Sequence, residues 1–205
     1  MGLYRERIVP HLVNWACATP GMERWRERVC DGLHGTVVEI GFGSGLNVVH
    51  YPATVEHVYA IEPSARSLRI GASRVATSPV PITHVGLDGQ SLPLEAATCD
   101  SALMTFTLCT VPDPEQVLRE LRRVLVPGGS LHFLEHGVAP SAGVARWQRL
   151  LDPLEQRVAD GCHLTRDAPG LIRNAGFDIT WLEQRFARGP KPWSYFSVGV
   201  ALSRD

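Results

Sequence analysis

The chain has 205 residues, of which 44% are hydrophobic and 20% charged, so it holds enough apolar material for one sizeable core and is not a disordered chain. Its 20 basic and 21 acidic side chains leave a formal net charge of −1, which disfavours a nucleic-acid partner.

The five cysteines are odd in number, and none follows another after two or three residues. This spacing disfavours a disulfide framework and a zinc site, so we predict no metal and free thiols in the cytoplasm.

Neither a targeting segment nor a membrane span is predicted. Arg5, Glu6 and Arg7 interrupt the region where a signal peptide would carry its apolar core. The longest mostly apolar stretch, residues 102–111, is too short to span a bilayer.

Strand and helix signals alternate through most of the chain. Two short helices are predicted within residues 1–31, on either side of a break at residues 19–21. Ser64 and Asp113 are expected to cap two later helices, the first with Leu68, Ala72 and Val75 on its apolar face. The alternation predicts a parallel sheet with crossover helices. The expected elements are strands at 36–40, 57–62, 81–85, 100–106 and 130–135, and helices at 46–50, 64–75 and 114–126, the last stopped by residues 127–129.

The last third of the sequence changes character. A helix is predicted over 144–159, interrupted near Asp152-Pro153, and another over 165–175. Strands are predicted over 177–182 and 193–202. No helix fits between these two strands, so they should form an antiparallel pair at the edge of the sheet.

A glycine-rich loop follows the first strand, with Gly41, Gly43 and Gly45 in alternate positions. Open α/β sheets bind ligands at this place, and the predicted helix after the loop would offer free N–H groups to an anion. Leu46 stands where a dinucleotide fingerprint requires glycine, which disfavours a nicotinamide cofactor. Glu39, at the end of an apolar strand, needs a role because burying an unpaired acid is costly.

Two further acids follow strands. Glu62 ends the second strand, where an acid accepts hydrogen bonds from two ribose hydroxyls; the alternative is a surface acid that begins a turn before Pro63. Asp88, followed by Gly89, could accept from the amine of adenine, or it could be an ordinary turn aspartate.

These segments, in this order, resemble class I S-adenosylmethionine-dependent methyltransferases of the type 11 branch. The resemblance covers roughly residue 24 to the C-terminus. Residues 133–136, 151–153 and 160–166 are similar to the methyltransferase-like 7 thiol methyltransferases, and the quinone-biosynthesis methyltransferases are the other similar group. The strings that carry the class resemblance are VVEIGFGSG (37–45), EP (62–63), LPL (92–94), CDSA (99–102) and LRELRRVLVPGG (118–129).

The resemblance implies an α/β fold: a Rossmann-like three-layer sandwich with a seven-stranded, mostly parallel sheet whose last strand is antiparallel. It implies a single domain over 1–205, with an N-terminal helical cover at 1–31 and a helical insert at 140–176 near the acceptor site. The implied cofactor is S-adenosylmethionine, and the product is S-adenosylhomocysteine. The apolar membrane anchor of the animal relatives is not matched by the charged start of this chain, so membrane association is not carried over.

The resemblance also assigns roles to individual residues. The three glycines would wrap the methionine part of the cofactor, Glu39 is expected to be a further cofactor-binding residue, and Glu62 would hold the ribose. The loop after the fourth strand lacks the Asn/Asp-Pro-Pro-aromatic signature of many base and glutamine methylases, which disfavours those substrates. The remaining implied contacts are Pro63 and Ser64 bordering the adenine, Asp88 and Gly89 at its edge, and Thr107 and Leu108 facing the methyl donor.

His136, after the fifth strand, is the candidate general base, although a structural histidine is an equal alternative. Cys109 is expected in the core or pocket wall and not as a nucleophile, because direct transfer needs no covalent intermediate. His163 could face the acceptor, but a structural role is favoured. Tyr4 and Trp15 are interpreted either as part of a lid over the donor or as simple packing of the N-terminal helix.

The predicted function is therefore methyl transfer from S-adenosylmethionine, by direct in-line displacement, to a small-molecule acceptor of the thiol or phenol type. The sequence leaves the oligomeric state open. A module that binds the cofactor without catalysis is one alternative, and a nicotinamide-dependent oxidoreductase is another.

Overall fold

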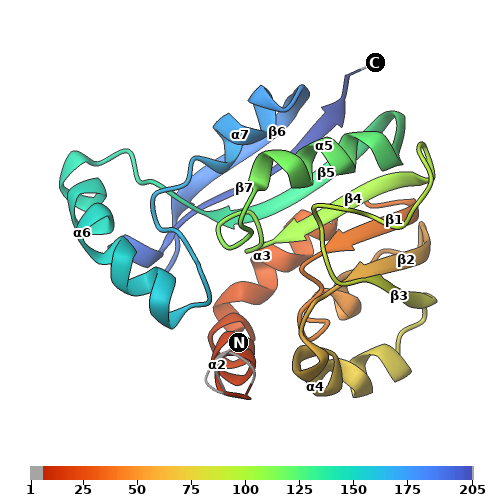
Figure 1. The fold of residues 1–205 in the computed structure, drawn as a ribbon, viewed down its shortest axis with the longest axis horizontal. Coiled ribbons are helices and arrows are strands. Elements are labelled where there is room, and N and C mark those ends of the chain that lie inside the picture. Colours follow the sequence, from red (N-terminus) through yellow and green to blue (C-terminus); the bar gives the residue numbers. More distant parts are fainter. Residues whose placement is uncertain (1–6, 205) are drawn as a thin grey trace.

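The structure is a computed structural model that describes residues 7–204 (Figure 1), so Tyr4 lies outside the described residues. Its helices are α2 (Val9–Cys17), α3 (Pro20–Cys30), α4 (Ala65–Ala76), α5 (Pro114–Val124), α6 (Ala142–Val158) and α7 (Ala168–Asn174), with single 3-10 turns η1 (Val48–His50) and η2 (Lys191–Trp193). Its strands are β1 (Gly35–Ile40), β2 (Val55–Ile61), β3 (Ile82–Gly86), β4 (Cys99–Thr105), β5 (Leu125–His136), β6 (Phe177–Phe186) and β7 (Tyr195–Ser203). None of these helices is long and apolar enough to cross a bilayer.

All seven strands form one sheet in the order β3-β2-β1-β4-β5-β7-β6. The first five strands run parallel, and β7 is antiparallel to both of its neighbours. This arrangement confirms the predicted fold class. The predicted antiparallel pair does occupy one edge of the sheet, with β6 outermost and β7 inserted beside β5.

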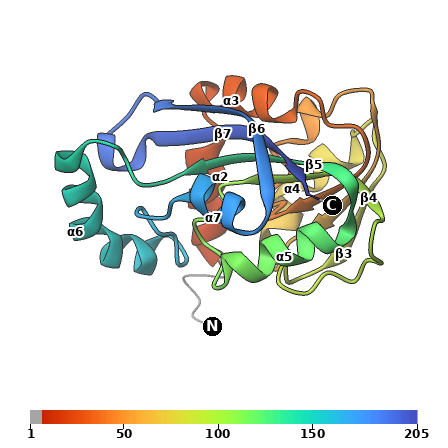
Figure 2. The same ribbon diagram turned by 90° about the horizontal axis from the view of Figure 1, so that it is seen from above.

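Helices cover both faces of the sheet, with α3 on one side and α5 and α7 on the other (Figure 2). Adjacent residues of the central strands point to opposite faces. Val37 and Leu103 join the cluster with α3, whereas their neighbours Val38 and Met104 join the cluster with α5. Burial on both faces explains why these strands read as continuous apolar runs in the sequence.

Two helix boundaries differ from the prediction. Helix α5 ends at Val124, because Leu125 is already extended and pairs with Cys99; residues 127–129, predicted to stop the helix, lie inside β5. Helix α7 begins only at Ala168, because the side chain of Asp167 caps it by accepting a hydrogen bond from the Gly170 N–H.

Helix α6 runs unbroken through Pro153, so the predicted interruption is wrong. The preceding residue, Asp152, is buried, and its carboxylate accepts hydrogen bonds from the Leu164 N–H at 2.6 Å and from Gln156 at 2.7 Å. These contacts hold the helix against the segment that follows it. Figure 2 shows α6 beyond the end of the sheet.

The glycine loop does not open into an α-helix, contrary to the expectation for residues 46–50. Only the 3-10 turn η1 follows it, so no helix N-terminus points at the loop. The capping roles of Ser64 and Asp113 are confirmed, since each side chain accepts from the N–H three residues on.

Helix α4 packs against the glycine loop through Gly71, whereas Ala72, predicted on the apolar face of this helix, is exposed. A Cβ on Gly71 would lie 2.5 Å from the carbonyl oxygen of Ser44. The same oxygen accepts a hydrogen bond from Arg74 at 2.9 Å. The close approach therefore requires glycine, and it ties α4 to the loop.

Replacing Gly71 with alanine should destabilise the fold by about 1–3 kcal/mol, because the new methyl group meets backbone and must displace α4. Chemical denaturation would measure the loss. The matched control is Gly21→Ala in α3, where nothing lies within 4 Å of the added Cβ. That variant should be neutral or more stable by at most about 1 kcal/mol. Equal effects of the two substitutions would contradict this account of the packing.

Candidate functional site

A cavity of about 500 Å³ opens at the carboxyl edge of the sheet, within the roughly 300–1,000 Å³ range of small-molecule sites. Its walls are the loops after β1, β2, β3 and β4, together with one side of α2 and a few residues after α6. The predicted site residues that line it are Gly41, Gly43, Glu62, Pro63, Ser64, Asp88, Gly89 and Thr107.

The first turn of the glycine loop is fixed by a close approach to the loop after β4. Gly41 has a φ of +71°, and a Cβ there would meet the Thr107 hydroxyl at 2.2 Å. That hydroxyl donates to the carbonyl oxygen of Ile40 at 3.0 Å. Only glycine satisfies both the backbone angle and the space, and the result is a bare backbone surface facing the cavity.

Glu62 lies in the cavity wall and is only 7% exposed. Its carboxylate accepts hydrogen bonds from the Gly43 N–H at 2.7 Å and from the Ser64 N–H at 2.8 Å. Burial raises the pKa of Glu62, and the two N–H groups act in the opposite direction. A carboxylate can accept about four hydrogen bonds, so acceptor capacity remains for a ligand's hydroxyl groups.

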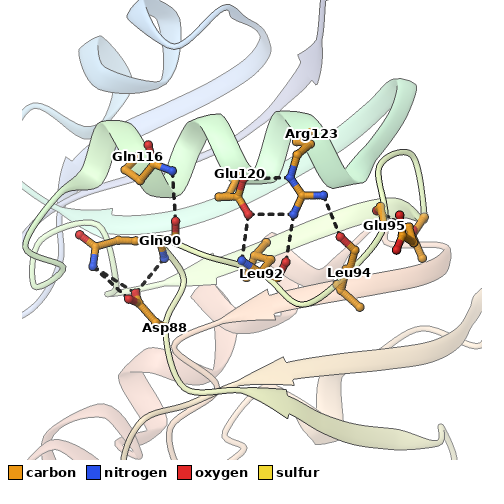
Figure 3. A network of polar contacts seen from close by, with 9 residues as sticks. Asp88, Gln90, Leu92, Leu94, Glu95, Gln116, Glu120 and Arg123 are labelled. Atoms are coloured by element: carbon orange, nitrogen blue, oxygen red, sulfur yellow. Dashed lines mark hydrogen bonds and ion pairs between the residues drawn. The ribbon is translucent and has the colours of Figure 1, made fainter.

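The loop after β3 is held by α5 (Figure 3). Glu120 accepts from the Leu92 N–H at 2.8 Å, and Arg123 donates to the carbonyl oxygens of Leu92 at 3.0 Å and Leu94 at 2.7 Å. These contacts explain the LRELRR string (118–123), because its Glu120 and Arg123 hold the LPL segment (92–94) in place. Earlier in the same loop, Asp88 accepts from the Gln90 N–H at 2.8 Å, so it is a turn aspartate that also lines the cavity.

The loop after β4 is organised by Glu135, a fully buried residue of β5. Its carboxylate accepts from the N–H groups of Thr107 at 2.8 Å, Leu108 at 3.0 Å and Cys109 at 3.3 Å. Burial, with a contribution from Cys109, raises the pKa of Glu135 to about 8. This acid therefore shapes the wall in which Thr107 lies.

Glu39 is fully buried and does not line the cavity. Its carboxylate accepts hydrogen bonds from the Tyr51 hydroxyl and from the Asn47 amide, the latter at 2.9 Å. Burial raises its pKa to about 7, against the lowering effect of these partners and of Arg26. The expectation that Glu39 contacts the cofactor is therefore not met, because its carboxylate is used by Asn47 and Tyr51 and lies behind the residues that face the cavity.

Arg26 of α3 is a cavity residue that the sequence reasoning missed. It is 5% exposed and donates to Asn47 at 2.6 Å and to Thr105 at 3.3 Å, while its Nε is buried with no partner among the described residues. A signal was available, because Arg26 falls on the apolar stripe of its helix with Trp25 and Val29. A buried cation on such a stripe needs an anionic or polar partner.

Helix α2 forms one wall of the cavity with Val9, Pro10, Val13 and Asn14. The Ser44 hydroxyl donates to Asn14 at 2.7 Å, which joins this wall to the glycine loop. Trp15 is 76% exposed and is not among the residues that line the cavity. Trp15 therefore neither covers the cavity nor packs onto the core, so neither interpretation of this residue agrees with the structure.

Three other predicted residues also lie away from the cavity wall. Gly45 and Leu108 are buried beneath their loops. His136 lies behind Phe106, with ring centres 6.4 Å apart, and its Nε2 is 2.8 Å from the sulfur of Cys162. The structure does not bring His136 to the place where an acceptor would bind.

Comparisons with known proteins agree with this geometry. The family model described as a methyltransferase domain matches residues 38–133. Thiol S-methyltransferase TMT1B of Rattus norvegicus is 33% identical over 172 residues, which cover 80% of this chain and 67% of that protein. Demethylmenaquinone methyltransferase of Thermobifida fusca is 26% identical over 191 residues, covering 90% and 71% respectively. A solved S-adenosylmethionine-dependent methyltransferase of Thermotoga maritima, described as a possible histamine N-methyltransferase, has the same fold, with a TM-score of 0.70, 24% identity and 97% of each chain covered.

A seven-stranded sheet with an antiparallel β7 and a glycine-lined cavity at its carboxyl edge defines the class of S-adenosylmethionine-dependent methyltransferases. Within that class, the chain belongs to the methyltransferase family that contains the TMT1 thiol S-methyltransferases and the demethylmenaquinone methyltransferases. Its cofactor is S-adenosylmethionine and its product S-adenosylhomocysteine, as the resemblance predicted. The bare backbone at Gly41 and the carboxylate of Glu62 fit this cofactor.

Glu62→Gln should weaken the binding of S-adenosylhomocysteine about 10- to 100-fold, because hydrogen bonds to a charged group contribute about 1.5–3 kcal/mol. Calorimetry would measure this. The matched control is Glu56→Gln, an exposed acid on β2, the strand that Glu62 follows, and this variant should bind as wild type does. The binding should also weaken as the pH falls, because protonation makes the acid neutral. Since burial raises the pKa of Glu62, this loss should begin at a higher pH than for an ordinary glutamate. Wild-type affinity in the Glu62→Gln variant would remove Glu62 from the cofactor site.

Proposed function

We propose that this methyltransferase acts on a small-molecule thiol by direct in-line displacement, with a phenol as the second candidate acceptor. The observation that carries the thiol is the 33% identity to a protein named as a thiol S-methyltransferase, over a stretch that covers 80% of this chain. The cofactor supplies a methyl group already activated on a sulfonium. The protein therefore has to align the acceptor and exclude water. The five free cysteines support a reducing, cytoplasmic setting.

The cavity walls support a neutral, mainly apolar acceptor. On the α2 side they present Val9 and Val13, and after β4 they present Val111 and Pro112. Apolar walls exclude water from the reacting atoms and favour a ligand of low charge. The nearly balanced net charge of the chain also fits such an acceptor.

Arg26 is proposed to hold the carboxylate of the cofactor's methionine part. The glycine loop lacks a following α-helix, so no helix N-terminus is available for that carboxylate. Arg26 reaches the same cavity from α3, and its Nε lacks a partner among residues 7–204. A guanidinium suits a carboxylate because it offers several N–H donors in a fixed plane.

Arg26→Met should weaken binding of S-adenosylhomocysteine about 10- to 100-fold, the loss expected for one charge-assisted hydrogen bond. It should leave the affinity for 5′-methylthioadenosine unchanged, because that nucleoside lacks the carboxylate. Both affinities can be measured by calorimetry, and Arg24→Met, an exposed arginine of the same helix, is the matched control. Equal losses for the two ligands would assign Arg26 to a structural role.

The proton of the acceptor thiol is proposed to leave before binding. A free thiol has a pKa near 8.5, so a few per cent is already thiolate at about pH 7. His136 remains a prediction as the base, but it does not line the cavity and its Nε2 faces Cys162. Binding of the thiolate from solution needs no side chain at that position.

With a panel of small thiols of different acidity, the pH midpoint of kcat/KM should follow the pKa of each acceptor. A phenol of matched shape serves as the comparison acceptor, and His136→Asn should keep the same profile. One fixed midpoint for every thiol, lost in His136→Asn, would instead identify His136 as the general base. Turnover of the phenol but of no thiol would contradict the proposed acceptor class.

A further inference from the structure

Three side chains that the proposed reaction does not use converge at the carboxyl ends of β4 and β5. Cys109 follows β4, His136 ends β5, and Cys162 lies in the turn after α6. The sulfur of Cys162 is 2.8 Å from His136 Nε2 and 3.5 Å from the sulfur of Cys109. One ligand atom from each residue lies within 4.8 Å of the other two.

We infer that Cys109, His136 and Cys162 form a binding site for Zn²⁺. Two sulfurs and one imidazole nitrogen are a donor set that zinc prefers, with the fourth tetrahedral position left to water or another small ligand. Zinc–sulfur bonds of about 2.3 Å and zinc–nitrogen bonds of about 2.0–2.1 Å place tetrahedral ligands roughly 3.8 Å apart for two sulfurs and roughly 3.6 Å apart for sulfur and nitrogen. The observed sulfur–sulfur distance is within about 0.3 Å of that value, and the distance from His136 Nε2 to the sulfur of Cys162 has to lengthen by about 0.8 Å.

The elements that carry the three ligands are fixed by other contacts. Glu135 accepts from the N–H of Cys109 at 3.3 Å, which anchors the loop after β4. The N–H of His163 donates to the carbonyl oxygen of Cys109 at 2.7 Å, which joins that loop to the turn holding Cys162. His136 belongs to β5 itself. The site is therefore organised before any ion arrives, which lowers the cost of binding.

The environment is compatible with a dication. Cys109 and Cys162 are 2% and 8% exposed, and loss of their two thiol protons to solvent on binding would make the three-ligand complex neutral. The Thr110 hydroxyl, 3.5 Å from the sulfur of Cys109, can donate to a bound thiolate. Arg166, the neighbouring cation, donates to the carbonyl oxygens of Leu108 and Val111.

The site adjoins the acceptor end of the cavity but is separate from it. Thr110, Phe106 and Ala159 line the cavity, and each contacts a member of the cluster: Thr110 contacts Cys109, Phe106 stacks with His136, and the carbonyl of Ala159 accepts from the N–H of Cys162. A bound ion would join the turn after α6 to β4 and β5 directly behind that wall. This inference is independent of which acceptor the enzyme methylates.

Spacing in the sequence could not indicate this site. The ligands come from three segments, and the two cysteines are 53 positions apart, whereas the usual zinc spacings place ligands in local pairs. The expectation of no metal rested on the absence of such pairs.

The test uses the full chain, purified under reducing conditions and equilibrated with Zn²⁺ alone or with Co²⁺ alone. Elemental analysis should find about one zinc per chain, and the cobalt form should show the thiolate charge-transfer and tetrahedral visible bands. Zinc should raise the Tm of the wild type, because an ion bound only by the folded state stabilises it. Cys109→Ala and Cys162→Ala should lose the stoichiometric zinc, the sulfur bands and the rise in Tm.

The matched control is Cys99→Ala, a buried cysteine at the opposite end of β4, which should retain all three signals. Zinc that persists in both ligand variants, or is lost equally in Cys99→Ala, would place the metal elsewhere and overturn the inference. A Cys109–Cys162 disulfide found by peptide mapping without reductant, together with no zinc binding after reduction, would replace the metal site with a redox pair. A folded, reduced wild type that binds no zinc would also overturn it.

Discussion

The cavity at the carboxyl edge of the sheet depends on one recurring interaction. A buried carboxylate, at or just beyond the end of a strand, accepts hydrogen bonds from donors in the neighbouring loops. Glu62 holds Gly43 and Ser64, and Glu135 holds three successive N–H groups of the loop after β4. Backbone N–H groups in irregular loops would otherwise be unsatisfied, and buried carboxylates would otherwise be unpaired. The hydrogen bonds between them satisfy both the N–H groups and the carboxylates. As a result, loops without regular structure acquire defined positions around the cavity.

A second feature of the cavity is the source of its positive charge. Many nucleotide-binding α/β proteins use a helix N-terminus to neutralise an anionic ligand group. Here the glycine loop ends in a short 3-10 turn, and a buried guanidinium from α3 occupies the same region. Arg26 is itself supported through Asn47, which also donates to Glu39, so the fully buried acid is one step behind the cavity. Helices α2 and α3 thus both contribute side chains to the wall of the cavity.

Much of the fold was predictable because it rests on local rules. Short apolar runs marked the strands, Ser64 and Asp113 marked two helix starts, and the glycine loop and Glu62 marked the cavity. Contacts between distant segments were not predictable in this way. Gly71 looks like an ordinary helical glycine until Ser44 is placed against it, and the cysteines at 109 and 162 are brought together by the turn after α6. The boundary between α5 and β5 was also missed, because pairing of Leu125 with Cys99 overrides local helix propensity.

The strand order β3-β2-β1-β4-β5-β7-β6 makes resistance to aggregation depend on the last strand. Every described residue that lines the cavity precedes position 161, yet β5 obtains its second neighbour only when Tyr195–Ser203 pairs with it. Until then, or after proteolytic loss of that segment, β5 is a long apolar edge with unpaired hydrogen-bonding groups, which invites aggregation. Protection against self-association therefore depends on the last strand, although that strand contributes nothing to the binding cavity itself.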